Sequence, residues 1–217
     1  MKPTLAVIHV DIAAGEDELA RERLLESLEA HQNPCLTVLW VNWLRERADL
    51  RVVCLIEDLE LFDDFLVEII RSVPGVRGTT AQLAFDGVVR SEALMDVSML
   101  NTGWDRRAAA TVQVKLQPGR DDEAYEALCR LPPHDMVDVV WVLKVFHSHD
   151  ADLQLLLLSE RTAALTGYVM SWIRTVPGVL DTNLTTVLDW RILGPTEAFV
   201  SVCERFPEQT AVPATGG

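Results

Sequence analysis

An internal repeat constrains the fold of this 217-residue chain more than any other feature. The hexapeptide RSVPGV at Arg71 to Val76 returns as RTVPGV at Arg174 to Val179, 103 residues further along. With the same displacement and no gap, Ala48 to Leu50 aligns with Ala151 to Leu153. Solenoid repeats are roughly 20 to 50 residues long, so a period of about 100 residues indicates a duplicated domain.

Hydrophobic periodicity predicts the order strand, helix, strand, strand, helix, strand in each half. The second helix of the first half, for example, has apolar residues at i, i+3, i+4 and i+7 from Phe62 and ends before Pro74 and Gly75. The elements predicted for the first half are strands Thr4 to Ile12, Cys35 to Leu44, Leu50 to Glu57 and Gly78 to Val89, and helices Glu16 to Ala30 and Leu59 to Ser72. Those predicted for the second half are strands Thr111 to Gln117, Val137 to Phe146, Leu153 to Leu158 and Asp181 to Trp190, and helices Asp121 to Leu131 and Thr162 to Thr175.

The repeat divides the chain into two copies of one unit, residues 1–90 and 108–206, joined by a connection over residues 91–107. Within the connection, we expect Ala93 to Met99 to form an additional strand. Residues 207–217 are rich in Pro, Thr and Gly and are expected to be disordered.

The predicted strands are apolar on both faces. In Cys35 to Leu44, Trp40 lies on one face and Trp43 on the other, and Val137 to Phe146 has the same character. Helices on one side leave the other face of a four-stranded sheet open, and an exposed apolar face of that size is rare. We therefore predict an α+β fold in which two ferredoxin-like βαββαβ units pack sheet to sheet, about 10 Å apart, as a pseudo-dimeric α/β barrel.

The composition excludes several classes of protein. Hydrophobic residues make up 49% of the chain, as in a folded protein, and the net charge of −14 disfavours direct binding to nucleic acid. No apolar run reaches the roughly 18 to 20 residues of a membrane span and no signal peptide is recognisable, so we expect a cytosolic chain. The four cysteines include no CxxC pair and are expected to be buried thiols.

The order of elements, the VPGV helix end and the Ala-Asp-Leu opening of the third strand resemble the ligand-sensing (RAM) domain of Lrp/AsnC regulators, here in two tandem copies. The resemblance covers nearly the whole chain. It implies a ferredoxin-like domain that pairs into an α/β barrel, assembles into oligomers and binds amino acids or related effectors. The helix-turn-helix that usually precedes this domain is not found here, because the first strand is reached at about Thr4. The resemblance therefore implies a non-catalytic regulatory module without a cofactor, which binds a small effector or pairs with a full-length regulator.

The same resemblance places an effector cleft at the turn between the second and third strands of each unit. The implied ligand-binding residues are Ala48, Asp49 and Thr79 in the first copy and His149, Ala151, Asp152 and Thr182 in the second. A carboxylate of Asp49 or Asp152 would accept the ammonium group of an amino acid, and the threonines would serve its carboxylate. Aspartate is also a common turn residue that bonds nearby backbone N–H groups, so a structural role remains open.

Three alternatives also remain open. Small monooxygenases and haem-handling enzymes are built on the same type of barrel, and His9 and His147 would then be the acid–base or axial candidates. The pair His147 and His149, two residues apart, could instead hold a metal ion. Finally, the chain could be a purely structural oligomerisation block. No GxSxG, HExxH or glycine-rich phosphate loop supports another kind of catalysis.

Overall fold

The computed structural model describes residues 3–31, 33–44, 50–99, 107–132, 134–146 and 151–208. The first unit comprises β1 (Thr4–Ile12), α1 (Asp17–Ala30), β2 (Leu36–Leu44), β3 (Leu50–Ile56), α2 (Glu60–Asp64), the π-helix η1 (Phe65–Ile70), β4 (Val76–Val89) and α3 (Ser91–Ser98). The second unit comprises β5 (Ala108–Leu116), α4 (Asp121–Cys129), β6 (Asp138–Phe146), β7 (Leu153–Ser159), α5 (Thr162–Tyr168), the π-helix η3 (Val169–Ile173), β8 (Val179–Ile192) and α6 (Thr196–Arg205). Every predicted strand and helix of the two βαββαβ units is present, with shifts of a few residues at the ends.

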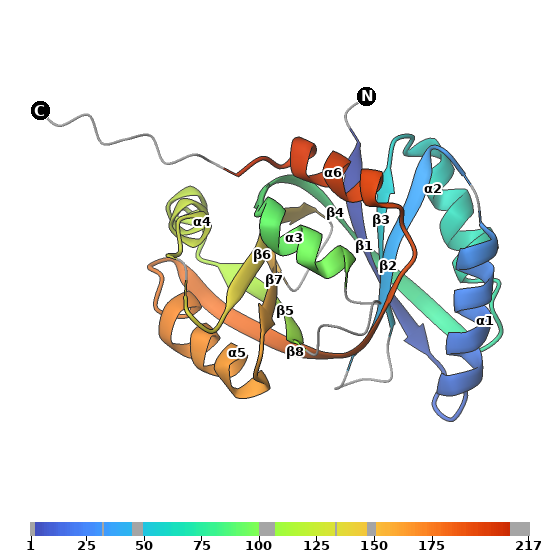
Figure 1. Ribbon diagram of the computed structural model, residues 1–217, viewed down its shortest axis with the longest axis horizontal. Coiled ribbons are helices and arrows are strands. Elements are labelled where there is room, and N and C mark those ends of the chain that lie inside the picture. The colour runs from blue at the N-terminus through green and yellow to red at the C-terminus, as the bar shows by residue number, and fades with distance from the viewer. Residues whose placement is uncertain are drawn as a thin grey trace, which may run out of the picture.

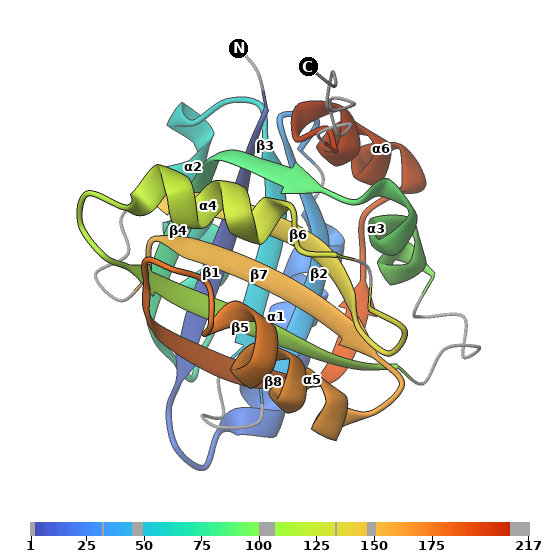
Figure 2. The ribbon, with the colours of Figure 1, turned by 90° about the vertical axis from the view of Figure 1, so that its left-hand side faces the viewer.

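The eight strands form one closed barrel in the order β1-β3-β2-β8-β5-β7-β6-β4. Each unit contributes four adjacent strands, and the two sheets face each other. Helices α1 and α2 cover the outside of the first sheet, and α4 and α5 cover the outside of the second (Figure 1, Figure 2). The predicted α+β fold of two ferredoxin-like units packed sheet to sheet is therefore confirmed.

Two long strands join the sheets. The first part of β4 pairs with β1 of its own unit, and its last part, Leu83 to Val89, pairs with β6 of the other unit. In the same way β8 pairs with β5 as far as Val187 and continues along β2 as far as Ile192. Register shifts occur where the strands change partner, and such bulges let a strand bend. Each unit thus lends a strand end to the other, which leaves the closed barrel without a free edge.

Three apolar cores explain why the strands are apolar on both faces. One lies between each sheet and its own helices, and the third fills the space between the sheets. At the centre of this inner core, Trp40 of β2 and Trp141 of β6 stack with ring centroids 5.3 Å apart. The two tryptophans occupy equivalent places in the repeat, because Trp40 pairs with Val53 and Trp141 with Leu156, which lie 103 residues apart.

The strand expected at Ala93 to Met99 is wrong, because this segment forms helix α3. Its buried residues Ala93, Leu94 and Val97 have helical spacing and pack against the inner core. A short apolar segment reads equally well as strand or helix, and here the tertiary contact decides.

Helix α6 is the counterpart of α3 in the second unit and was not predicted. Its buried residues Ala198, Phe199 and Val202 repeat the spacing found in α3. The two helices lie side by side across one end of the barrel (Figure 1). There the ring of Phe199 stacks on that of Trp40, with the two ring centroids 5.8 Å apart. Helices α3 and α6 therefore close that end of the inner core.

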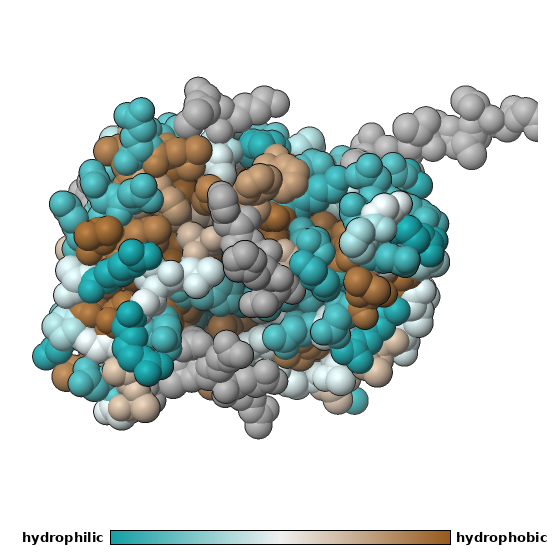
Figure 3. All heavy atoms as spheres, turned by 180° about the vertical axis from the view of Figure 1, so that it is seen from behind, coloured by the Kyte–Doolittle hydropathy of each residue, from teal (hydrophilic) through white to brown (hydrophobic). Residues whose placement is uncertain are grey.

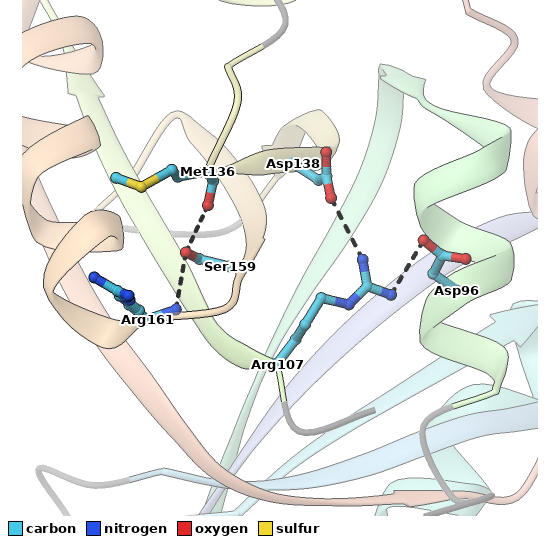
Figure 4. Close-up of polar contacts among 6 residues, drawn as sticks. All are labelled: Asp96, Arg107, Met136, Asp138, Ser159 and Arg161. Carbon is cyan, nitrogen blue, oxygen red and sulfur yellow. Dashed lines mark hydrogen bonds and ion pairs between the residues drawn. The ribbon is translucent and has the colours of Figure 1, made fainter. Parts of the chain in front are cut away.

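Ion pairs fix α3 to the second unit (Figure 4). Arg107 precedes β5. Its Nη2 lies 3.1 Å from Oδ2 of Asp96 on α3, and its Nη1 lies 3.4 Å from Oδ2 of Asp138 on β6. Nearby, the hydroxyl of Ser159 donates a hydrogen bond to the carbonyl oxygen of Met136 at 2.6 Å.

The unit boundaries stay a prediction, and residues 209–217 of the expected disordered tail lie outside the described residues. No helix in the described ranges is long and apolar enough to cross a bilayer.

Candidate functional site

One end of the barrel interior is lined by polar side chains. Alternate residues of a strand point to the same side, so His9 of β1 points inward like Leu5 and Val7, which belong to the inner core. His9 pairs with Arg51 of β3 on one side and with Thr80 of β4 on the other. Arg51 in turn pairs with Asn42 of β2. The first sheet therefore carries an unbroken row of inward-facing polar residues.

The second sheet has an equivalent row. Gln113 of β5 pairs with Gln154 of β7 and with Asn183 of β8. Further polar residues lie one step deeper on both sheets. We call the whole set the polar end: Asn42, Arg51, His9, Thr80 and Gln82 of the first sheet, and Gln113, Gln154, Asn183, Thr111 and Thr185 of the second.

The polar end lies opposite the end closed by α3 and α6. Strands β4 and β8 run from the polar end towards those helices, which follow them directly in the chain. Figure 3, which views the molecule from behind, shows hydrophilic and hydrophobic residues intermixed on the face turned away from α3 and α6. Thr80 and Asn183 are exposed and His9 and Gln113 are half-buried, whereas Arg51 is buried. The rows therefore lead from solvent into the barrel.

Several polar-end atoms are buried without a hydrogen-bond partner among the described residues. These atoms are Nε and Nη1 of Arg51, Oδ1 of Asn42, Oε1 and Nε2 of Gln154, and Oγ1 of Thr111. Arg51 is only 2% exposed and Gln154 is fully buried. Leaving a buried donor or acceptor unpaired costs about 1–3 kcal/mol. Such a concentration of unpaired groups in one place is typical of a site completed by a bound molecule.

Arg51 brings a positive charge into this end. Burial lowers the pKa of its guanidinium to about 9, so the group is still protonated at neutral pH. By register its neighbours are the neutral amide of Asn42 and the imidazole of His9. A buried charge without an opposite charge is costly. An anionic ligand would remove that cost.

Asp152, the aspartate predicted to bind an effector, lies at the start of β7 and is tied to β5. Its Oδ2 accepts a hydrogen bond from the backbone N–H of Leu116 at 2.7 Å, and its Oδ1 lies 3.4 Å from Nζ of Lys115. The neighbouring Ala151 is buried. The other loop residues named with them, Ala48, Asp49 and His149, lie outside the described residues, as does His147.

The two predicted threonines occupy equivalent places in the repeat. Thr79 accepts a hydrogen bond from Nε of Arg71 at 2.7 Å, and Thr182 accepts one from Nε of Arg174. Thr182 pairs with Val114 of β5. Asp152 accepts a hydrogen bond from Leu116 of the same strand. The structure therefore brings these two predicted residues to opposite sides of β5. Both threonines alternate with the inward-facing Thr80 and Asn183 and so lie on the helix side of their sheets. Their effector role stays a prediction.

Haem, which the enzyme alternative includes, does not fit the described residues. Of the described histidines, only His9 lies on an inward-facing strand position; His31 packs against Phe65 outside the barrel and His134 against Tyr168. Polar residues flank His9, and the space deeper between the sheets is filled by the stacked tryptophans. A porphyrin would need a broad cleft there. No three of the described His, Cys, Asp and Glu side chains lie close enough to hold a metal ion.

Sequence reasoning considered His9 but missed the rest of the polar end. A signal was present, because Arg51 and Gln154 are 103 residues apart and each interrupts an apolar strand at the same place in the repeat. Two polar residues at matched positions of buried strands point to a shared interior site. Without the closed barrel, however, the sequence did not reveal which strand face was the interior.

Comparison with known proteins supports the fold. No known family profile matches the sequence, and no curated protein matches it. Many solved structures are similar in shape, and three of them illustrate the likeness. A Lactobacillus acidophilus NCFM protein provisionally described as a monooxygenase has 9% identity and a TM-score of 0.55, over 89% of this chain and 98% of its own.

The second similar structure is an anthrone oxidase-like protein, with 10% identity and a TM-score of 0.58 over 90% of this chain and 95% of its own. The third is the chlorite dismutase of Candidatus Nitrospira defluvii in complex with imidazole, with 13% identity and a TM-score of 0.55 over 94% and 95% of the two chains. Identities this low establish the dimeric α/β barrel fold alone.

Proposed function

We propose that this chain is a small-molecule enzyme of the monooxygenase type, with its organic substrate bound in the polar end of the barrel. The observation that carries the proposal is the group of buried, unpaired polar atoms around Arg51 and Gln154. A buried polar atom without a hydrogen bond lowers the free energy of unfolding, and a polar substrate would supply the missing partners. The likeness to a protein provisionally described as a monooxygenase and to an anthrone oxidase-like protein supports the reaction class.

In this proposal His9 transfers the proton. Imidazole is the side chain most used for proton transfer near neutral pH. His9 is half-buried and borders Arg51, so it is placed to meet both substrate and solvent. It removes a proton from an acidic CH₂ group, the carbanion that remains adds O₂, and the imidazolium returns the proton to the peroxide that forms. Loss of water from this hydroperoxide then leaves a carbonyl group, so one oxygen atom enters the product and the other leaves as water. Trp40 and Trp141 provide an apolar floor for the substrate ring.

The regulatory reading has less support than the enzymatic one. Of its two acidic candidates, Asp49 lies outside the described residues, and Asp152 already accepts a hydrogen bond from Leu116. Nothing in the reported likenesses favours an amino-acid sensor over an enzyme.

Oxygen uptake tests the proposal. The purified protein is incubated in air-saturated buffer with a panel of phenols, anthrones and 1,3-dicarbonyl compounds while dissolved O₂ is recorded. We expect protein-dependent uptake with at least one compound, and we expect His9→Gln to slow that uptake by about 10²–10⁴-fold. Glutamine occupies the equivalent position 113, so this variant should fold.

His31→Gln is the matched control, because His31 lies outside the barrel beside Phe65. It should keep the full rate. The proposal is wrong if no compound of the panel causes oxygen uptake, or if His9→Gln retains the rate of the unchanged protein.

A further inference from the structure

We infer that the molecule bound in the polar end carries an anionic oxygen group and that Arg51 is the residue that binds it. The inference rests on the proposed function only in taking the polar end as the binding site, and it adds the chemical class of the ligand. Carboxylates, enolates and phosphoryl groups share this chemistry.

The first argument is the excess of unpaired donors. Inside the barrel, the buried N–H groups without an acceptor among the described residues belong to Arg51 at Nε and Nη1, Gln154 at Nε2, and Trp40 and Trp141 at Nε1. Arg51 and the two indoles carry no acceptor atom. The unpaired acceptors of the polar end, Oδ1 of Asn42, Oε1 of Gln154 and Oγ1 of Thr111, are fewer than these five N–H groups. A ligand rich in acceptor oxygens would pair with them, whereas a cation or an apolar molecule would not.

The second argument is the contrast with arginines elsewhere in the chain. On the surface, Nη2 of Arg120 lies 2.8 Å from Oε2 of Glu123, and Nη2 of Arg191 lies 3.1 Å from Oε1 of Glu29. Arg51 is far more buried than either, yet it forms no ion pair with a described residue. A buried guanidinium is tolerated when a negative charge accompanies it. Charge-assisted hydrogen bonds from arginine to oxyanions are among the stronger ones available to proteins.

The third argument is the difference between the two halves. The place of Arg51 is taken by Gln154 in the second sheet, that of His9 by Gln113, and that of Asn42 by Leu143. Two of these three positions are therefore polar in both sheets, but only the first sheet carries a guanidinium charge. We expect one anion for each chain, although the fold itself is duplicated.

Thermal melting and calorimetry test this inference with three probes: benzoate, its neutral analogue benzamide, and inorganic phosphate. Benzoate should raise the melting temperature by about 3 °C at ten times its dissociation constant, with one site per chain, and benzamide should have little effect. Stabilisation by phosphate rather than by benzoate would support the inference and identify a phosphoryl group as the anion.

Arg51→Gln should abolish the response to the anion, and Arg51→Lys should keep part of it because the charge remains. Arg51→Gln should fold, because glutamine occupies the equivalent position in β7. Its melting temperature without ligand should be unchanged or higher, since a buried charge has been removed. The matched control is Arg130→Gln at the exposed residue that directly follows α4, and this variant should respond like the unchanged protein.

Two further outcomes would overturn the inference and separate it from the proposed function. If benzoate and benzamide stabilise the protein equally, and Arg51→Gln still responds to both, the polar end binds small molecules but does not select anions. If none of the three probes has any effect while an uncharged compound still drives oxygen uptake, the enzyme proposal survives and the anion site does not.

Discussion

At the scale of single residues, Arg51 and Cys54 show that the two faces of one buried strand have different environments. Both lie on β3, all of whose residues are buried. Cys54 packs into the core between the first sheet and its helices, where a small apolar side chain suffices. Arg51 points to the other side, into the barrel, and keeps its charge there. Because Gln154 fills the equivalent place in β7, the fold does not require a charge at this position, and a binding role explains it better.

The thiols provide a prediction at this scale. Burial raises the pKa of Cys54 far above its usual range, and burial is also the main cause that raises the pKa of Cys129 to about 11. Only the thiolate reacts readily with alkylating agents. At pH 8 we expect iodoacetamide to leave Cys54 unmodified in the native protein and to modify Cys129 slowly.

Peptide mass spectrometry after timed alkylation measures both rates, and the protein unfolded in guanidinium provides the reference in which all cysteines react. Alkylation of Cys54 at the same rate in native and unfolded protein would contradict the burial described here.

At the scale of secondary structure, the turn after the second helix explains the most visible part of the repeat. Gly75 and Gly178, the glycines of the two PGV segments, have φ angles of +96° and +92°. Side chains other than hydrogen are strained in this region. In addition, a Cβ atom at Gly75 would lie 2.9 Å from Cβ of Ala20 on α1. The repeated glycine is thus needed for the turn and for the close approach of α1.

We therefore expect Gly75→Ala to destabilise the protein by about 1–2 kcal/mol. Gly78→Ala is the matched control, because Gly78 has no positive φ and a Cβ there would meet nothing within 4 Å. Urea denaturation should separate the two variants clearly. Equal stabilities would show that the turn does not need glycine.

The same elements show what the sequence could and could not predict. Strands β2 and β6 were predicted because both of their faces are apolar, and the sheet-to-sheet packing followed from that. Helix α3 was taken for a strand because Ala93 to Met99 is short and its periodicity is ambiguous. Most of the polar end was missed because alternation distinguishes the two faces of β3 without saying which one faces the barrel interior. That assignment depends on pairing between β2 and β8, far apart in the chain.

At the scale of the whole molecule, two units share one core. The inner core draws residues from both sheets and from α3 and α6, and the β2–β8 and β4–β6 seams are hydrogen-bonded along their length. Neither unit could bury its inner sheet face alone. The two units should therefore unfold in one transition, although each is a separate copy of the sequence repeat.

Trp141→Ala tests this cooperation. Removing a fully packed tryptophan from a core costs about 3–5 kcal/mol, and the loss should appear as one shifted unfolding transition that is the same by circular dichroism and by fluorescence. Trp172→Ala, at a partly exposed position on η3, should cost far less. Two separate transitions in the Trp141 variant would contradict a shared core.

The central claim is that a small anionic molecule binds between the sheets, and an NMR titration tests it most directly. The indole N–H signals, assigned by single substitution, are followed as benzoate is added to ¹⁵N-labelled protein. We predict saturable shifts for Trp40 and Trp141, which border the polar end, and no shift for Trp172 outside the barrel. Shifts confined to Trp172, or no shifts at concentrations that stabilise the protein, would contradict the claim.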